Sequence, residues 1–300
     1  MRRDIERYVK TCRKCQLCKK TTSKKHGLLP PKEAEPAMPW QRVNVDMVGP
    51  FKVHQPNGKI LELQALTMID PATGWFEVKE VPSIDSTSCM EAFDDTWLSR
   101  YPRPQFLGFD NGKEFKKVFA EMCENYGMAK KPSTKYNPQS NGIIERVHQV
   151  LNDMLRTFEL ESQQLDSKDP WTRFLSATAF AIRSTYHTTL EATPAQLVFG
   201  RDMLLPVKFE ANWAQLKIKR QQEMLRNNER ENKSRIPHEY KVGDLVTLNK
   251  PGIFRKMSTP KLGPYAIERV YNNGTVLIRK GPVAERVNIR RCHPFLEEQN

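Results

Sequence analysis

The sequence predicts an α/β protein in which a mixed core of strands and helices lies between a partial cysteine-bearing helical module and a small β-barrel. First, 300 residues with 38% hydrophobic content can bury one large core or two smaller ones. Second, strand and helix patterns alternate through the middle of the chain, whereas only short strands follow the last helical stretch. Third, clustered cysteines precede a proline-rich stretch near the amino end. We therefore divide the chain into a helical module at 1–26, a linker at 27–39, a core at 40–205, a helical linker at 206–238 and a barrel at 239–297.

The core opens with three strands that we expect to pair in antiparallel order. Residues 43–48 form a short segment with an apolar, β-branched pattern, and a turn signal follows at 55–58. Residues 61–69 and 75–81 have the composition of two further strands. Asp70, which follows the second of these, is a carboxylate at a strand end, and we assign it to the turn itself.

Helices and one short strand complete the core. We expect a helix at 86–101, a buried strand at 105–109 and a helix at 114–126 that stops before a glycine. An irregular segment at 130–139 then leads into a helix at about 142–158, whose apolar residues recur on one face.

The rest of the chain is predicted to be helical and then entirely β. Asp169-Pro170 marks the start of a helix that runs to about residue 187. Residues 213–235 form a polar helix without an apolar stripe, which is typical of a bridge between domains. The short strands that follow lie at 245–249, 265–270, 275–279 and 286–289.

Charge is distributed unevenly along the chain. The net formal charge is +13, which divides into +7 over residues 1–38, −3 over 39–200 and +9 over 201–300. Basic ends of this kind favour a polyanionic partner, because binding releases the counterions condensed on phosphates. A solvated basic surface without a ligand is the alternative that charge alone leaves open.

The sequence contains no run of about 18 apolar residues and no apolar segment near its amino end, so we expect an intracellular protein. Without a secretory context, the six cysteines are not expected to form disulfides.

Three carboxylates are candidates for chemistry. Asp46 lies at the polar end of the first strand, Asp110 follows the buried strand at a sharp turn, and Glu145 lies on the first turn of the 142–158 helix. Three carboxylates gathered together repel one another by up to ~4 kcal/mol per pair near 4 Å, so they need a cation. Oxygen ligands favour Mg²⁺ or Mn²⁺, and two such ions can support phosphodiester substitution. A strand-end Asp, a turn Asp and a solvated Glu with no common site are the alternative.

Motifs in the same order resemble a known family. Val43-Asn-Val-Asp46, Phe109-Asp-Asn-Gly-Lys-Glu-Phe115, Tyr136-Asn-Pro-Gln-Ser-Asn-Gly142 followed by Glu145-Arg-Val-His148, and Thr193-Pro194 with Val198-Phe-Gly-Arg201 are similar to the core of retrotransposon and retroviral integrases, most of all the gypsy-type branch. The resemblance covers about 160 residues.

This resemblance implies an RNase H-like catalytic core, with a mixed five-stranded sheet and helices. It also implies that Asp46, Asp110 and Glu145 form a catalytic Asp, Asp, Glu triad that holds two Mg²⁺ or Mn²⁺ ions. The reactions implied are 3′ end processing and strand transfer, which are endonuclease and nucleotidyltransferase activities. Double-stranded DNA, both element ends and target, is the implied partner, with a homo-oligomer assembled on DNA and a nuclear location.

The chain departs from the family pattern in two ways. Asp110 and Glu145 have 34 residues between them, whereas the family usually has 35, and the missing residue falls in the 115–123 helix. Asn137 replaces the usual His, and His148 replaces the usual Asn. His148, Gln149 and Asn152 share the polar side of the helix, and their positions resemble DNA-facing ones.

Cys12 and Cys15 have the spacing of two Zn²⁺ ligands, but a closed site requires four. The segment around them resembles the last helix of the integrase His-His-Cys-Cys module, so we expect an amino-terminally truncated module that binds Zn²⁺ only if the upstream histidines are restored. Cys18 and His26 are the alternative source of two ligands. An incomplete zinc module should be unfolded or loosely docked.

The basic end contains Val242-Gly-Asp-Leu-Val246 and Lys261-Leu-Gly-Pro-Tyr265, which resemble the SH3-like barrel that ends gypsy-type integrases. Basic residues around one loop are candidate phosphate contacts, namely Lys250, Arg255, Lys256 and Lys261.

Two readings of function therefore remain. One is an active integrase of the gypsy type. The other is a catalytically inactive DNA-binding remnant or host-recruited protein, which the absent histidines and the one-residue contraction favour.

Overall fold

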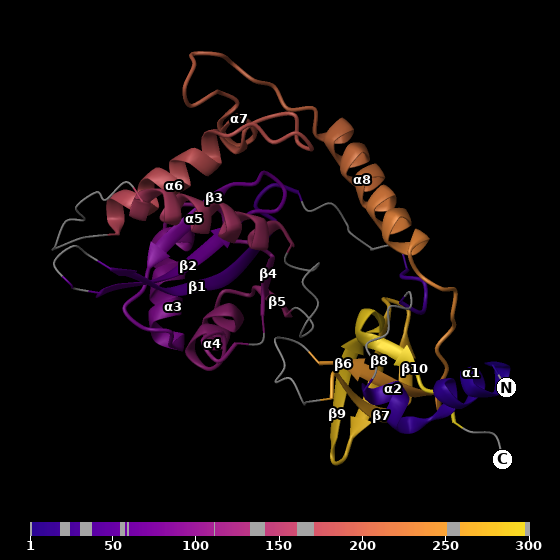
Figure 1. The fold of residues 1–300 in the computed structure, drawn as a ribbon. Helices are drawn as coiled ribbons and strands as arrows, with labels where there is room; N and C mark the ends of the chain where they lie inside the picture. Colours follow the sequence, from indigo (N-terminus) through magenta and orange to yellow (C-terminus); the bar gives the residue numbers. More distant parts are fainter. Residues whose placement is uncertain are drawn as a thin grey trace. The chain divides into compact units, whose positions relative to one another are not determined.

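The first three strands of the core pair in antiparallel order, as predicted (Figure 1). They are β1 (Arg42–His54), β2 (Ile60–Ile69) and β3 (Phe76–Glu80). β4 (Phe106–Phe109) pairs in parallel with β1, and β5 (Ala129–Pro132) pairs in parallel with β4. The result is a mixed five-stranded sheet in the order β3-β2-β1-β4-β5.

This computed structural model describes residues 2–18, 25–30, 38–54, 58, 60–110, 112–132, 142–160, 171–250 and 259–297. The chain forms two units, one of residues 35–220 and one of residues 1–34 together with 221–300. In the described part of the chain, no helix has the length and apolar content needed to cross a membrane.

The core helices differ from prediction mainly at their ends. α3 (Ser86–Phe93) continues into a π-helical turn at Asp94–Leu98, and α4 is shorter than expected, at Val118–Asn125. Lys117, immediately before α4, has a φ of 51°, which is incompatible with a helix extending back from that point. α5 (Gly142–Leu160), α6 (Thr172–Ser184), α7 (Pro194–Phe199) and α8 (Trp213–Lys233) follow.

The segment expected to be irregular after residue 129 begins with β5, so that expectation was wrong for its first residues. Two of its four residues are lysines, and its composition is not that of a typical strand. β5 lies at the edge of the sheet, where charged side chains are common because they discourage pairing with other chains.

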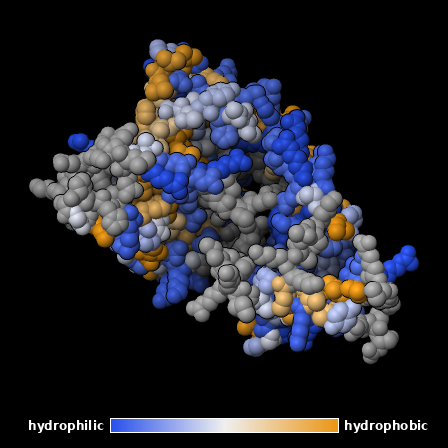
Figure 2. Space-filling model, viewed as in Figure 1, coloured by the Kyte–Doolittle hydropathy of each residue, from blue (hydrophilic) through white to orange (hydrophobic). Residues whose placement is uncertain are grey.

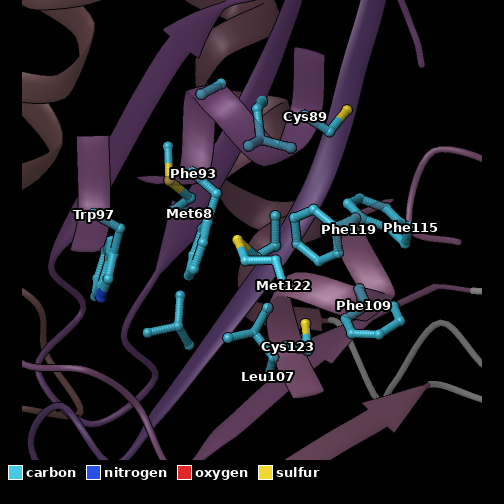
Figure 3. Packing of buried hydrophobic residues seen from close by; sticks show 14 of the residues in the cluster. Met68, Cys89, Phe93, Trp97, Leu107, Phe109, Phe115, Phe119, Met122 and Cys123 are labelled. Atoms are coloured by element: carbon cyan, nitrogen blue, oxygen red, sulfur yellow. The ribbon is translucent and has the colours of Figure 1, made fainter. Parts of the chain in front are cut away.

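One face of the sheet is covered by α3 and α4. Figure 3 shows the buried cluster, in which Phe109, Phe115 and Phe119 lie close together and Phe93 and Met68 lie nearby. The ring centroids of the three phenylalanines are 5.2–5.8 Å apart. Aromatic pairs at such distances add about 0.5–1.5 kcal/mol beyond the burial of their area, so this cluster anchors β4 and α4 together.

The other face of the sheet is covered by α5 and α6. Leu151 and Leu155 of α5 pack with Val48 of β1 and Leu63 of β2, and Trp171 lies in the same cluster. Because side chains alternate between the two faces of a strand, Asp46 shares the α5-covered face with Val48.

α8 is polar on nearly all sides, as predicted, and Figure 2 shows it as a hydrophilic surface. Leu216 is its buried residue, and it packs with Leu190, Ala192 and Leu197. The boundary between the two units falls within this helix.

The second unit contains a five-stranded antiparallel sheet in the order β10-β6-β7-β8-β9. A buried apolar cluster fills it, with Val246, Ile267 and Ile278 fully enclosed. The strands are β6 (Leu245–Asn249), β7 (Lys261–Tyr271), β8 (Thr275–Lys280), β9 (Val283–Asn288) and β10 (Cys292–Pro294).

The amino-terminal segment belongs to this second unit, with α1 (Arg2–Thr11) and α2 (Arg13–Cys18). Leu29 is buried in the apolar cluster of this sheet, and its backbone N–H donates to Asn232 Oδ1 over 2.9 Å while its carbonyl accepts from Asn232 Nδ2 over 3.0 Å. The Arg235 guanidinium donates to the backbone carbonyls of Gly27 and His26. Residues 26–29 are therefore held against this sheet by side chains from the end of α8 and from the residues after it.

Candidate active site

Asp46 and Asp110 lie next to each other because β1 and β4 are parallel neighbours. The register pairs Val43 with Leu107 and Asn44 with Gly108, and two further residues along each strand lead to Asp46 and Asp110. In open α/β sheets, ligands bind beyond the carboxyl ends of parallel strands. The sheet therefore brings the first two candidate carboxylates to one place.

Each of these carboxylates accepts a local backbone hydrogen bond. Asp110 is exposed, and its Oδ1 accepts from the backbone N–H of Gly112 over 2.8 Å, which fixes the turn after β4. Asp46 is partly buried, and its Oδ1 accepts from the backbone N–H of Met47 over 2.9 Å. A carboxylate has about four acceptor positions, so one such hydrogen bond does not by itself prevent a carboxylate from binding a cation.

Glu145 lies on the first turn of α5, and its side chain lies outside the described residues. Its backbone position is nevertheless informative, because His148 lies one turn further along the same helix face. His148 Nε2 is 2.8 Å from Thr67 Oγ1, and Thr67 is the residue of β2 that pairs with Asp46. The turn that carries Glu145 is therefore adjacent to Asp46.

Thr67 is a site residue that the sequence analysis missed. It is fully buried, and its hydroxyl donates to the backbone carbonyl of Asp46 over 2.8 Å. The signal was present in the sequence as a single hydroxyl within an apolar strand, Ala65-Leu-Thr-Met-Ile69. A buried hydroxyl needs hydrogen-bond partners, so such a residue points to a specific neighbour.

His148 has different surroundings from those expected of a solvated, DNA-facing residue. Its imidazole is partly buried and bonded to Thr67, and burial lowers its pKa to about 4, so the ring is neutral at pH 7. Gln149 is exposed and Asn152 is partly buried. Of the three polar positions predicted to face DNA, Gln149 is the one most open to solvent.

The carboxylate positions fit divalent cations by their chemistry. Carboxylate oxygens are the ligands that Mg²⁺ and Mn²⁺ favour. Among the residues whose side chains the structure describes, no three His, Cys, Asp or Glu side chains form a group suited to a metal ion, and Glu145 is outside that set. The described pair is Asp46 and Asp110, and the backbone of α5 supplies the third position beside them.

Asp70 acts within its turn, as assigned from the sequence. Its carboxylate accepts hydrogen bonds from the backbone N–H of Ala72 over 2.8 Å, from the Thr73 hydroxyl over 2.8 Å and from the backbone N–H of Trp40 over 3.1 Å. The side chain is fully buried, and this burial raises its pKa. Asp70 thus ties the chain entering β1 to the turn after β2.

The paired cysteines lie at the junction of α1 and α2. Cys12 and Cys15 are both partly buried, and hydrogen bonds from Cys15 lower the pKa of the Cys12 thiol. The alternative zinc site with Cys18 and His26 is not formed, since those four residues make no metal-binding group in the described part of the chain. Instead, the backbone of His26 forms an isolated parallel β-bridge with Ile236, and its ring lies edge-on to the rings of His238 and His293.

The basic candidates of the second unit differ in their burial. Lys250 is partly buried, and its Nζ donates to the Thr259 hydroxyl over 3.2 Å. Lys261, by contrast, is only 6% exposed, and burial lowers its pKa, which corrects the expectation that it lies on a loop surface as a phosphate contact. Arg255 and Lys256 lie outside the described residues.

Comparison with known proteins finds relatives that include Pol polyproteins and an integrase-like protein. No protein-family model matches the chain. The chain is 26% identical over 296 residues to the Pro-Pol polyprotein of Simian foamy virus type 3, across 97% of this chain and 23% of that protein. It is 26% identical over 212 residues to Gypsy retrotransposon integrase-like protein 1 of Bos taurus, across 68% of this chain and 38% of that protein.

A solved structure extends this likeness to the fold. A chain of the simian T-cell lymphotropic virus intasome in complex with PP2A regulatory subunit B56 gamma matches with a TM-score of 0.64 and 16% identity, over 100% of this chain and 92% of that chain. The chain spans 23% and 38% of the lengths of the two relatives. The predicted resemblance to retrotransposon and retroviral integrases of the gypsy-type branch is confirmed.

Proposed function

We propose that this relative of retroviral and gypsy-type integrases is a polynucleotidyl transferase that processes and joins DNA ends, with its active site at Asp46, Asp110 and Glu145. The observation that carries the proposal is the parallel register of β1 and β4, which aligns Asp46 with Asp110 beside the first turn of α5. Residues far apart in the chain are thereby brought together at one edge of the sheet.

The reaction is a pair of phosphodiester substitutions. In the first, a water oxygen bonds to phosphorus while the bond from phosphorus to the 3′ oxygen breaks, which leaves a 3′ hydroxyl and a 5′ phosphate. In the second, that 3′ hydroxyl bonds to a target phosphorus while one target P–O bond breaks. One P–O bond forms for each one broken, so strand transfer needs no external source of energy.

The three carboxylates are proposed to hold two Mg²⁺ or Mn²⁺ ions. When bound, such a pair activates the attacking oxygen and stabilises the leaving oxygen. The fold of the chain positions these carboxylates. The register of β1 and β4 places Asp46 beside Asp110, and the packing of α5 against the sheet determines where Glu145 lies. Zn²⁺ at Cys12 and Cys15 would require two further ligands from upstream.

DNA and a second copy of the chain are the proposed partners. The chain carries +7 over residues 1–38 and +9 over 201–300, which suits duplex DNA. Joining two DNA ends requires at least two active sites, so we propose a homo-oligomer assembled on DNA in the nucleus. We also propose that the antiparallel sheet of the second unit is an SH3-like barrel that contributes phosphate contacts.

A catalytically inactive DNA-binding remnant is the second candidate, and the 34-residue spacing between Asp110 and Glu145 is the observation that favours it. Metal-dependent chemistry on DNA distinguishes the two. The test is strand transfer of a labelled duplex end with Mn²⁺ or Mg²⁺, comparing the chain with its Glu145→Gln variant. Joined product that disappears in the variant supports the enzyme. Intact duplex binding without product in either protein supports the remnant.

A further inference from the structure

Two hydrogen bonds in series connect α5 to the strand that carries Asp46. The Thr67 hydroxyl donates its single proton to the backbone carbonyl of Asp46 over 2.8 Å. The same oxygen is 2.8 Å from His148 Nε2, so the hydroxyl must accept there. The imidazole is therefore protonated on Nε2, which agrees with a neutral ring whose pKa is lowered to about 4 by burial.

This connection lies at the end of α5 that carries Glu145. The apolar anchor Val147, directly beside His148, packs with Ile69 and Phe76, and Leu151 and Leu155, one to two turns further along the helix, pack against β1 and β2. Apolar packing depends on buried area and is non-directional, whereas a hydrogen bond requires defined distances and angles. The bond from His148 can therefore fix the rotation of the first turns about the helix axis more closely than the apolar packing of Val147, Leu151 and Leu155.

We propose that His148 and Thr67 are positioning residues that hold the first turns of α5, and with them Glu145, at a fixed place beside Asp46. The inference rests on the proposed function, because it concerns the geometry of that same site. Neither residue needs to touch DNA or a metal ion for this role. A displacement of the order of 1 Å in an active site can reduce a rate on the order of 100-fold, so a single hydrogen bond is enough to matter.

The substitutions that test this remove the connection in different ways. Thr67→Val deletes the hydroxyl at nearly constant volume, and His148→Leu deletes the donor. His148→Gln keeps an N–H donor at a similar reach and serves as the conservative variant. Thr178→Val is the matched control, because Thr178 is also fully buried in the core unit but its hydroxyl has no hydrogen-bond partner in the described part of the chain.

Strand-transfer kinetics give the first readout. Thr67→Val and His148→Leu should each lower the rate about 10- to 100-fold with duplex affinity unchanged, while His148→Gln and Thr178→Val stay within about threefold of the parent chain. Because the two residues form one connection, the double variant Thr67→Val/His148→Leu should be no slower than the slower single variant. Independent, multiplying losses would overturn the proposal.

Amide hydrogen exchange gives a second readout that does not depend on activity. The amides of residues 146–150, which lie in the first turns of α5, should exchange at least tenfold faster in Thr67→Val and His148→Leu than in Thr178→Val. Equal exchange in all variants would overturn the positioning role even if the parent chain were active. If Glu145→Gln kept full activity while exchange changed as expected, the proposed function would fail and the connection itself would stand.

Discussion

Acidification should weaken the second unit of the chain through His293, whose imidazole is buried in β10. The side chain is 7% exposed, and burial lowers its pKa to about 4. The positive charges of Lys261, His26, Lys25 and Arg235 act in the same direction. Burial and these neighbouring charges all disfavour protonation of the His293 imidazole.

The size of the effect follows from the two protonation states. An unfolded histidine takes up a proton near its ordinary pKa of 6.5, whereas folded His293 does so only near pH 4. The unfolded state therefore binds more protons between these values, so the stability contributed by neutral His293 is complete above pH 6.5 and is lost as the pH falls toward 4. A difference of about 2.5 pKa units corresponds to roughly 3 kcal/mol, at about 1.4 kcal/mol per unit.

The measurement is amide hydrogen exchange of the strands β7 and β8 in the full chain at several pH values between 7 and 5, corrected for intrinsic exchange rates. The free energy of opening should fall with pH in the parent chain and fall less steeply in His293→Gln, by up to about 1.4 kcal/mol per pH unit. His187→Gln, which changes an exposed histidine of the other unit, is the control and should match the parent slope. Parallel slopes in the parent and His293→Gln would refute the reasoning.

Three further changes test other parts of the structure. Asp46→Asn should abolish metal-dependent strand transfer while duplex affinity stays within about twofold; loss of both together would show that binding and chemistry are not separate. Leu29→Ala should lower the free energy of opening of strands β6 to β10 by about 2–5 kcal/mol, measured by hydrogen exchange, because Leu29 is buried in the apolar cluster of that sheet. A loss below about 1 kcal/mol would mean that Leu29 is not packed there. Lys250→Gln should reduce the magnitude of the slope of log K against log salt concentration for duplex binding by about 0.9. The same substitution at the buried Lys261 should leave that slope unchanged. Equal changes of slope would contradict the different burial of the two lysines.

Local patterns in the sequence were sufficient for the strands and for two of the candidate carboxylates. The apolar runs that end at Val48 and Phe109 identified β1 and β4, and a carboxylate lies near the end of each. The side-by-side placement of Asp46 and Asp110 depends on a parallel pairing between segments about 60 residues apart. Local periodicity contains no information on such pairing, so the resemblance to integrases supplied it.

The features that the sequence did not predict are all long-range contacts. β5 is recognisable as a strand only because β4 lies beside it. Leu29 was expected in a linker, yet it completes a core whose other members lie more than 200 residues later. Lys261 has the composition of a surface residue, and its burial follows from its place at the start of β7, which no local signal indicates.

The one-residue contraction before Glu145 can also be judged from the fold. Its expected place is the helix at 115–123, and α4 indeed begins only at Val118, after a turn that contains Lys117 with a positive φ. Beyond α4, the chain returns to a fixed point, since Ala129 pairs with Phe106 and its N–H donates to the carbonyl of Gln105 over 2.8 Å. The loss of one residue before α4 therefore shortens only the turn at Lys117, and the pairing of Ala129 with Phe106 keeps β5 in place.

Two insertions of a single alanine should therefore have opposite effects on strand transfer. Inserted after Lys117, the extra residue lengthens a turn that precedes a fixed pairing, so strand transfer should stay within about threefold of the parent chain. Inserted after Arg146, it rotates Glu145 by about 100° relative to His148, because an α-helix has 3.6 residues per turn, and strand transfer should fall below detection. Circular dichroism and duplex binding confirm that both proteins fold. Loss of activity with the first insertion alone would mean that the shortened turn, and not the rotation of α5, controls the position of Glu145.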